Sequence, residues 1–223
     1  MRISLFLLLI SISSIVSSKD ANIFYPAASI PANLKEDVNS VIRLEQTQYK
    51  VISLSEAILK VRIVKTVLNE KGKREGILYL GYDKLKKVNS IKGNIYNGSG
   101  KLIEKLKSGD IKDVSAVSDF SLFEDNRIKI YEPKVISYPY TVEYEYEYLD
   151  KNLLFYPTWD PLSRNTSSIE DALLEIIIPK HFKLRFKQLN LQEPPQSSSD
   201  EKNKIINGIL KILKLLNKRI MAP

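Results

Sequence analysis

The sequence predicts an all-β protein, an antiparallel β-sandwich with a short N-terminal helix and a C-terminal amphipathic helical tail. The first observation is the segment 140–149, YTVEYEYEYL, in which apolar or aromatic residues alternate with polar ones. Successive side chains of a strand point to opposite faces, so one face meets a core and the acidic face meets water. The second observation is a series of short segments rich in β-branched residues and separated by turns.

The elements follow one another in a regular order. Residues 31–39 predict a short helix, because Pro31 suits a helix start and acidic residues suit its first turns. Residues 58–68 and 76–82 predict a hairpin around a glycine-containing turn. The run NGSG at 97–100 predicts a second hairpin. Together the expected strands cover residues 41–52, 58–68, 76–82, 88–96, 101–106, 127–131, 140–149, 172–178 and 184–189.

The first eighteen residues have the three parts of a secretory signal peptide. Arg2 gives the positive start, an apolar run follows, and Val16 and Ser18 occupy the positions that a signal peptidase reads. The alternative is a membrane anchor, but this apolar run is shorter than the ~20 residues that a bilayer needs. We therefore expect residues 1–18 to be removed and the mature protein to be periplasmic or secreted, in a Gram-negative cell envelope.

The composition changes twice near the end of the chain. Residues 194–204, PPQSSSDEKNK, have no core-forming capacity, which predicts a polar linker after a sandwich domain over residues 19–193. Residues 205–223 contain IINGILKILKLLNKRI, and this spacing predicts a basic amphipathic helix. Its apolar face would comprise Ile209, Ile212, Leu213, Leu216 and Ile220. Such a tail could touch a membrane surface.

Composition excludes several classes of function. The chain has no cysteine, so it cannot hold a disulfide, a thiolate metal site or a cysteine nucleophile. Its one histidine, His181, cannot form a histidine metal cluster within the chain. The net charge of +8 is concentrated in the tail, whereas the charges of residues 19–200 nearly balance. A phosphate-binding footprint would lie on the folded domain, so we expect no nucleic-acid partner.

Few side chains suggest chemistry, and we expect no catalytic residue, no cofactor and no metal. Carboxylates gather between residues 110 and 125, where they could bind calcium or serve a glycosidase, but their spacing matches no calcium loop. We interpret them as loop caps and as partners of Arg127. The four residues that could form a ligand or partner surface are Trp159, Glu143, Glu145 and Glu147. Trp159 could stack on a sugar, although closing a sandwich core is the more usual role for such a tryptophan.

Several motifs, in order, carry a family resemblance. They include SIP at 29–31, TVLNEKG at 66–72, DIKD at 110–113, YPYTVEYEYE at 138–147 and PTW at 157–159. Over roughly residues 25–200 the chain resembles the domain of unknown function that precedes transglutaminase-like domains in bacterial cell-envelope proteins. The resemblance implies an exported β-sandwich module with no activity of its own. The catalytic cysteine of a transglutaminase-like domain is absent, so that activity does not transfer.

These observations predict an exported, non-enzymatic accessory or interaction module that is truncated before a catalytic domain. Its expected partner is a transglutaminase-like domain or another envelope protein, and no transmembrane segment remains after signal cleavage. The alternative is a glycan- or peptidoglycan-binding module of the periplasm. The tail replaces the aromatic strand with which the family's domain ends, so we expect it to be the product of a frameshift near Lys204. A genuine membrane-seeking helix is the other explanation.

Overall fold

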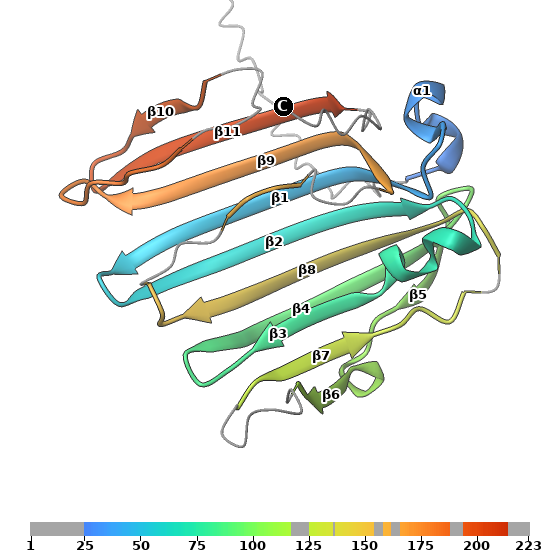
Figure 1. Cartoon of the computed structure of the whole chain (residues 1–223), viewed down its shortest axis with the longest axis horizontal. Coiled ribbons are helices and arrows are strands. Elements are labelled where there is room, and N and C mark those ends of the chain that lie inside the picture. Colours follow the sequence, from blue (N-terminus) through green and yellow to red (C-terminus); the bar gives the residue numbers. More distant parts are fainter. Residues whose placement is uncertain are drawn as a thin grey trace, which may run out of the picture.

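The all-β prediction is confirmed by the computed structural model, which describes residues 25–116, 125–135, 137–153, 158–161, 166–187 and 194–213. Strands form one sheet of eight and one of three (Figure 1). The large sheet runs in the order β10 (Gln196–Ser199), β11 (Asn203–Leu213), β9 (Ser167–Pro179), β1 (Ser40–Ser53), β2 (Glu56–Val67), β8 (Tyr140–Asp150), β4 (Lys86–Asn97) and β5 (Leu102–Lys105). The small sheet contains β3 (Leu78–Tyr82), β7 (Arg127–Tyr131) and β6 (Lys112–Ser115). The expected signal peptide, residues 1–18, lies outside the described residues.

The large sheet is antiparallel except for one pair. Strands β1 and β9 are parallel, with Ser40 opposite Ser167 and Lys50 opposite Ile177. At the start of the two strands, the side-chain hydroxyl groups of Ser40 and Ser167 form a buried hydrogen bond, with their Oγ atoms 2.7 Å apart. The sequence contains no local signal for this pairing, because 127 residues separate the two serines.

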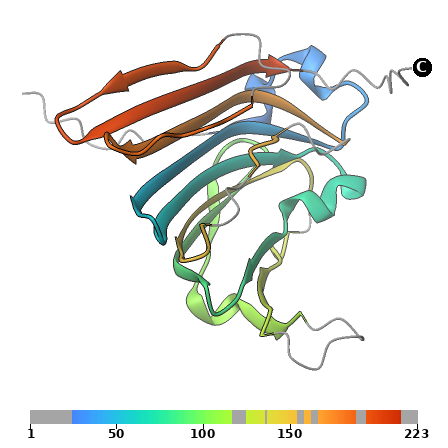
Figure 2. The ribbon, with the colours of Figure 1, turned by 60° about the vertical axis from the view of Figure 1, so that its left-hand side comes forward.

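The small sheet covers only part of the large one. Leu78 and Leu80 of β3 and Tyr131 of β7 share a buried cluster with Tyr144 and Tyr148 of β8. The rings of Tyr131 and Tyr144 meet edge to face, with centroids 6.0 Å apart. Figure 2 shows the small sheet as a second layer beside the β8–β4 part of the large sheet. The expected arrangement of two packed sheets therefore applies to one half of the molecule at most.

The other half of the same face is covered by irregular segments. Trp159 packs against Ile42, Ile169 and Ala172, which are buried side chains of β1 and β9. Nearer the opposite end of these strands, Leu153, Phe182 and Leu184 cover a cluster of four buried residues: Tyr49, Val51, Ala57 and Ile178. Residues 184–189 were expected to form a strand, but residues 182–187 are irregular and the remainder lies outside the described part. Phe182 and Leu184 of this segment pack on the sheet.

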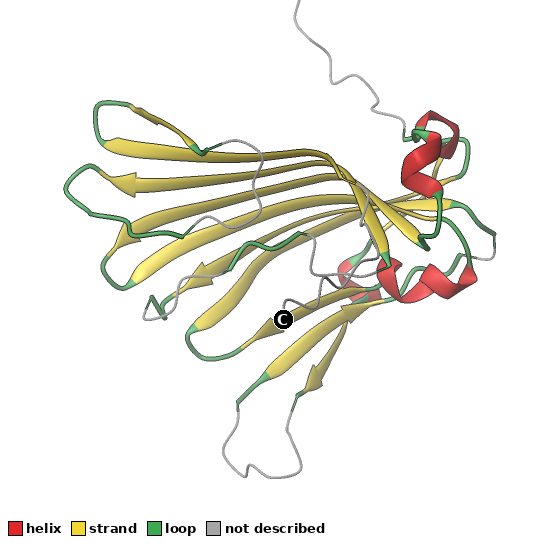
Figure 3. Ribbon diagram, turned by 45° about the horizontal axis from the view of Figure 1, so that its top comes forward, coloured by secondary structure: helices red, strands yellow, loops and turns green. Residues whose placement is uncertain are grey.

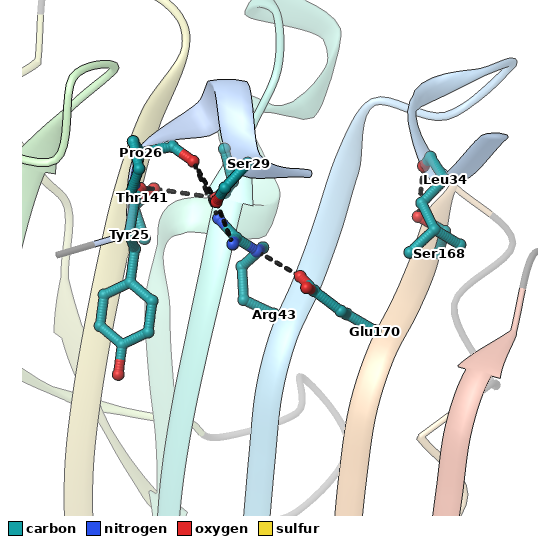
Figure 4. A network of polar contacts seen from close by, with 9 residues as sticks. Tyr25, Pro26, Ser29, Leu34, Arg43, Thr141, Ser168 and Glu170 are labelled. Atoms are coloured by element: carbon teal, nitrogen blue, oxygen red, sulfur yellow. Dashed lines mark hydrogen bonds and ion pairs between the residues drawn. The ribbon is translucent and has the colours of Figure 1, made fainter. Parts of the chain in front are cut away.

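The N-terminal segment is held to one end of the large sheet by polar contacts (Figure 4). Arg43 of β1 donates to the carbonyl of Pro26 at 3.3 Å and to Ser29 Oγ at 2.9 Å, and it forms an ion pair with Glu170. Ser168 of β9 donates to the carbonyl of Leu34 at 2.5 Å. The helix expected over 31–39 is shorter, since α1 covers only Ala32–Lys35.

The chain has three short helical turns. One, η1 (Ala27–Ser29), precedes α1, whereas η2 (Glu70–Gly76) connects β2 to β3 and η3 (Ser108–Asp110) connects β5 to β6. The hairpin expected from residues 58–68 and 76–82 was wrong, because β2 pairs with β1 and β8 along its two edges and β3 pairs with β7. The hairpin at NGSG is confirmed between β4 and β5, and Gly100 has a φ of 85° that favours glycine.

The end of the chain differs most from expectation. Strand β11 pairs antiparallel with β9 from Asn203 opposite Pro179 to Leu213 opposite Ile169, so residues 205–213 are extended and not helical. The predicted linker 194–204 instead contains β10 and the turn into β11. The remaining tail, 214–223, lies outside the described residues. Pairing with β9 satisfies the backbone groups along that strand's second edge.

None of the helices among the described residues has the length and apolar character needed to span a membrane.

Candidate functional site

A shallow groove runs across the face of the large sheet that lies opposite the small sheet. It encloses about 460 Å³ and crosses β9, β1, β2, β8 and β4. Its lining residues are Gln46, Thr47, Gln48, Lys60, Val61, Arg62, Ser90, Lys92, Glu145, Tyr146, Glu147, Leu173 and Glu175. Most of these residues are polar, so the groove can bind a ligand through hydrogen bonds and charge.

Strand register builds this groove from two rows of side chains. One row crosses the sheet through Gln48, Lys60, Glu147 and Ser90, which are direct neighbours on successive strands. The second row lies two residues along and consists of Gln46, Arg62, Glu145 and Lys92. Because residues two apart share a face, both rows project from the same side of the sheet.

The charges in the groove alternate from strand to strand. Lys60 lies 3.3 Å from Glu147, and Arg62 lies 3.4 Å from Glu145. Hydrogen bonds from Asn89, together with the ion pair to Lys60, hold the pKa of Glu147 below its usual value. The groove is therefore balanced in charge, although the sequence of β8 on its own predicts an acidic face.

Glu143 is buried, which corrects its predicted place on a solvated face. Its side chain accepts hydrogen bonds from Arg62 at 2.7 and 3.0 Å, from Tyr96 at 2.7 Å and from Asn94 at 3.1 Å. Burial alone would raise the pKa of Glu143, but these donors outweigh burial and lower it. Tyr25 closes the cluster by accepting a 3.0 Å hydrogen bond from Arg62. Glu143 therefore anchors the N-terminal segment and is not part of an open surface.

Glu145 and Glu147 do reach the groove, whereas Trp159 lies on the other face of the sheet. Its indole Nε1 donates to Glu45 Oε1 at 3.1 Å, and its ring covers Ile42 and Ile169. The structure thus places two of the four predicted surface residues in the groove; Glu143 lies on the same face but is buried, and Trp159 lies on the other face. The tryptophan occupies the core-closing position that the sequence analysis weighed against sugar stacking.

The carboxylates that were considered for calcium binding or glycosidase catalysis form structural contacts instead. Asp113 accepts hydrogen bonds from Lys129, Tyr82 and Arg127, which lower its pKa to about 2. Asp110 caps its own turn by accepting from the backbone N–H of Lys107. These contacts confirm the interpretation as loop caps and Arg127 partners; Asp119 and Glu124 lie outside the described residues.

His181 is exposed and contacts Phe182, with ring centroids 4.4 Å apart. Among the described residues no group of three or more metal-ligating side chains comes together.

The groove residues of β1, β2 and β4 were missed by the sequence analysis. Gln46 and Gln48, Lys60 and Arg62, and the pair Ser90 and Lys92 are each spaced by two. This spacing was the available signal, because polar residues at alternate positions of a strand mark a second, non-core face. This spacing does not indicate which strands are neighbours in the sheet.

Comparisons with known proteins agree with this fold. The model of a family described as "Domain of Unknown Function with solved-structure structure" (DUF3857) matches residues 56–207. No curated protein matches the sequence. A crystal structure of a candidate protease from Parabacteroides distasonis is 11% identical with a TM-score of 0.67, covering 83% of this chain and 38% of the other. The chain thus spans about two fifths of that structure, and the likeness shows the fold alone.

Two further structures are less similar. An M1 zinc metallopeptidase from Deinococcus radiodurans is 10% identical with a TM-score of 0.35, covering 77% of this chain and 39% of the other. A candidate nutrient-binding protein from Legionella pneumophila is 10% identical with a TM-score of 0.37, covering 78% of this chain and 64% of the other.

Proposed function

The chain belongs to the DUF3857 family, and we propose that it is an exported, non-enzymatic accessory module that holds a polypeptide partner in its polar groove. The partner is a transglutaminase-like catalytic domain or another envelope protein. The observation that carries this proposal is the groove itself, which crosses five adjacent strands and carries alternating charges on β2, β8 and β4. The chain matches about two fifths of the longer structure from Parabacteroides distasonis, and a partial match of this kind is also expected for an accessory domain.

The lining chemistry favours a polypeptide ligand. Among the described residues, Lys92 and Gln46 form no side-chain hydrogen bond or ion pair, so their polar groups remain available beside the paired charges. Amides, ammonium groups and carboxylates in alternation complement a strand that carries side chains of both signs. Tyr146 is the one aromatic lining residue, and its ring packs on the core face with Tyr148. The groove therefore lacks the flat aromatic platform on which sugars stack.

The absence of catalysis is supported by how the reactive groups are used. Asp113 is held by two cations, and Glu143 is saturated by donors from three side chains. Nucleophilic catalysis needs a base beside a hydroxyl and a third group that orients the base. His181, the single histidine, is exposed beside Phe182.

Site-specific photocrosslinking tests the partner. A benzoylphenylalanine at Ser90, within the groove, should yield a covalent adduct with one polypeptide when the protein is expressed in its own envelope. The matched control is the same probe at Tyr79, which is exposed on the small sheet. Adducts of equal yield at both positions, or none at Ser90, would contradict the groove assignment. N-terminal sequencing of the envelope protein tests export, with Lys19 expected as the first residue.

The glycan-binding alternative has a separate test. Trp159 is the only tryptophan, so fluorescence excited selectively at tryptophan, and not at the twelve tyrosines, reports on that side chain alone. Cell-wall fragments should leave its emission unchanged, because its ring is packed on β1 and β9. A saturable change in emission, lost in Trp159→Phe, would support glycan binding instead.

A further inference from the structure

The turns at one end of the large sheet form a surface distinct from the groove. Strand register places the end of β1 beside the start of β2, the end of β8 and the start of β4. The end of β9 lies at the same end, next to the start of β11. Figure 3 shows these connections as loops along one end of the strands. We call this surface the turn end; it comprises residues 50–56, 83–87, 150–152, 179–183 and 199–204.

The most exposed large apolar side chain among the described residues is at the turn end. Leu54 occupies the tip of the β1–β2 hairpin and is 82% exposed, and Ile52 beside it is also exposed. Leu85, 48% exposed, occupies the β3–β4 turn. That turn contacts β8, since the backbone N–H of Lys151 donates to the carbonyl of Leu85 at 2.8 Å. Apolar residues thus project from two neighbouring turns.

Lysines surround these apolar tips. Basic residues outnumber acidic ones in the turn end, and most of them are exposed: Lys50, Lys84, Lys86, Lys87, Lys151, Lys180, Lys183, Lys202 and Lys204. The acidic residues are Glu56, Asp83, Asp150, Asp200 and Glu201. Asp83, Asp150 and Asp200 each accept hydrogen bonds from the backbone of their own turn. These three carboxylates are therefore engaged by their own turns, whereas most of the lysines are exposed; among them, Lys84 forms an ion pair with Asp125 and Lys86 lies over the ring of Tyr148.

From this placement we propose that the turn end docks on an anionic lipid bilayer, with Leu54 and Leu85 entering the headgroup region and the lysines contacting lipid phosphates. This surface is separate from the groove and does not depend on the proposed function. Buried apolar area and attraction to anionic lipids together set the strength of such interfacial binding. Each lysine near an anionic surface contributes about fivefold to partitioning.

A bilayer fits these observations better than a protein or a nucleic acid. Protein interfaces are enriched in aromatic residues and arginine and depleted in lysine. At the turn end every exposed basic side chain is a lysine, the exposed lysines outnumber the two exposed acidic residues, and the exposed large apolar residues are aliphatic. Nucleic-acid binding takes its affinity mainly from phosphate contacts, and these would leave the two exposed leucine side chains in water. Leucine tips flanked by lysines match the boundary between headgroups and acyl chains.

The chain contains no cysteine, which allows one position to be labelled at a time. Full-length Leu54→Cys, carrying an environment-sensitive dye, should shift its emission to the blue with phosphatidylglycerol vesicles and not with phosphatidylcholine vesicles. The control is Ile103→Cys on β5, an exposed apolar position that pairs toward the other end of β4. Its dye should not respond. Because the two labelled proteins have the same N-terminal segment and the same tail, binding through those segments cannot produce the difference.

Charge reversal provides the second measurement. Lys151→Glu combined with Lys180→Glu should lower partitioning of the labelled protein at least tenfold, and about 0.5 M salt should do the same. The control pair, Lys35→Glu with Lys101→Glu, lies away from the turn end and should leave partitioning unchanged. Equal dye responses at positions 54 and 103, or partitioning insensitive to the first pair, would overturn the proposal. An equal response to polyglutamate would overturn it too, because it would identify an acidic polypeptide as the ligand.

Discussion

Replacing Glu143 by glutamine removes the charge at the centre of the best-connected buried cluster. Its carboxylate accepts from Arg62, Tyr96 and Asn94, and the residue is 7% exposed. Glutamine keeps the shape but presents an NH2 group in place of one acceptor, so the Arg62 guanidinium loses its counter-charge. Removing one partner of a buried ion pair costs about 3–5 kcal/mol. Since the Arg62 side chain is 28% exposed, water offsets part of this loss, and we expect about 3 kcal/mol.

The pH dependence gives the prediction its sign. The pKa of Glu143 is lowered in the folded protein because hydrogen bonds from Arg62, Tyr96 and Asn94 outweigh burial. A group with a depressed folded pKa contributes its full stability above its unfolded pKa, about 4.3 for glutamate. That contribution is lost as the pH falls through the folded pKa. The stability difference between wild type and Glu143→Gln should therefore be constant from pH 6 to 8 and decrease below about pH 4.3.

Urea denaturation followed by circular dichroism measures both quantities. The matched control is Glu145→Gln, two residues along the same strand with a side chain that is 49% exposed, for which we expect a change within about 0.5 kcal/mol. The reasoning would be refuted if the control were the more destabilised variant. It would also be refuted if the cost of Glu143→Gln stayed the same between pH 7 and pH 3.5.

Four further substitutions test the packing by the same denaturation assay. Tyr144→Ala should cost about 3–5 kcal/mol, because its ring is 2% exposed and its hydroxyl donates to a backbone carbonyl; a loss under 1 kcal/mol would contradict the register of β8. Gly72→Ala should cost about 1–3 kcal/mol, since its Cβ would lie 2.3 Å from the Asn39 carbonyl oxygen. Gly81→Ala, with open space around the Cβ, should be neutral or slightly stabilising. Ile206→Asp should lower stability by at least about 2 kcal/mol, because the side chain is buried in β11; an unchanged midpoint would show that this strand is not part of the folded domain.

Local patterns predicted the central strands well. The alternation in β8 identified Tyr140, Val142, Tyr144, Tyr146 and Tyr148 as one core face; four of these residues are buried and Tyr146 is half-buried. Strand β7 begins and ends where the sequence analysis expected. These predictions depend only on side chains alternating along one strand, which is a property of the chain itself.

Pairing between distant strands was not predictable in the same way. Whether Glu143 faces water depends on Arg62, Asn94 and Tyr96, which two other strands bring alongside it. Its neighbours Glu145 and Glu147 have the same spacing and sequence context, yet only Glu143 is covered by Tyr25 and the segment that follows. The groove has the same origin, because its rows of charge exist only once β1, β2, β8 and β4 are adjacent.

The C-terminal segment shows how tertiary context decides between two readings of one pattern. Residues 205–213 are apolar at positions compatible with a helix, and the same residues alternate well enough for a strand, with Ile206 and Gly208 buried. A helix would leave the isoleucine-rich strand β9 with an open edge on the side away from β1. Extending the segment along β9 instead satisfies the backbone from Asn203 to Leu213 and carries Ile206 onto the core face. The partner strand β9 therefore determines that residues 205–213 form a strand and not a helix, and the sequence of the segment alone does not determine it.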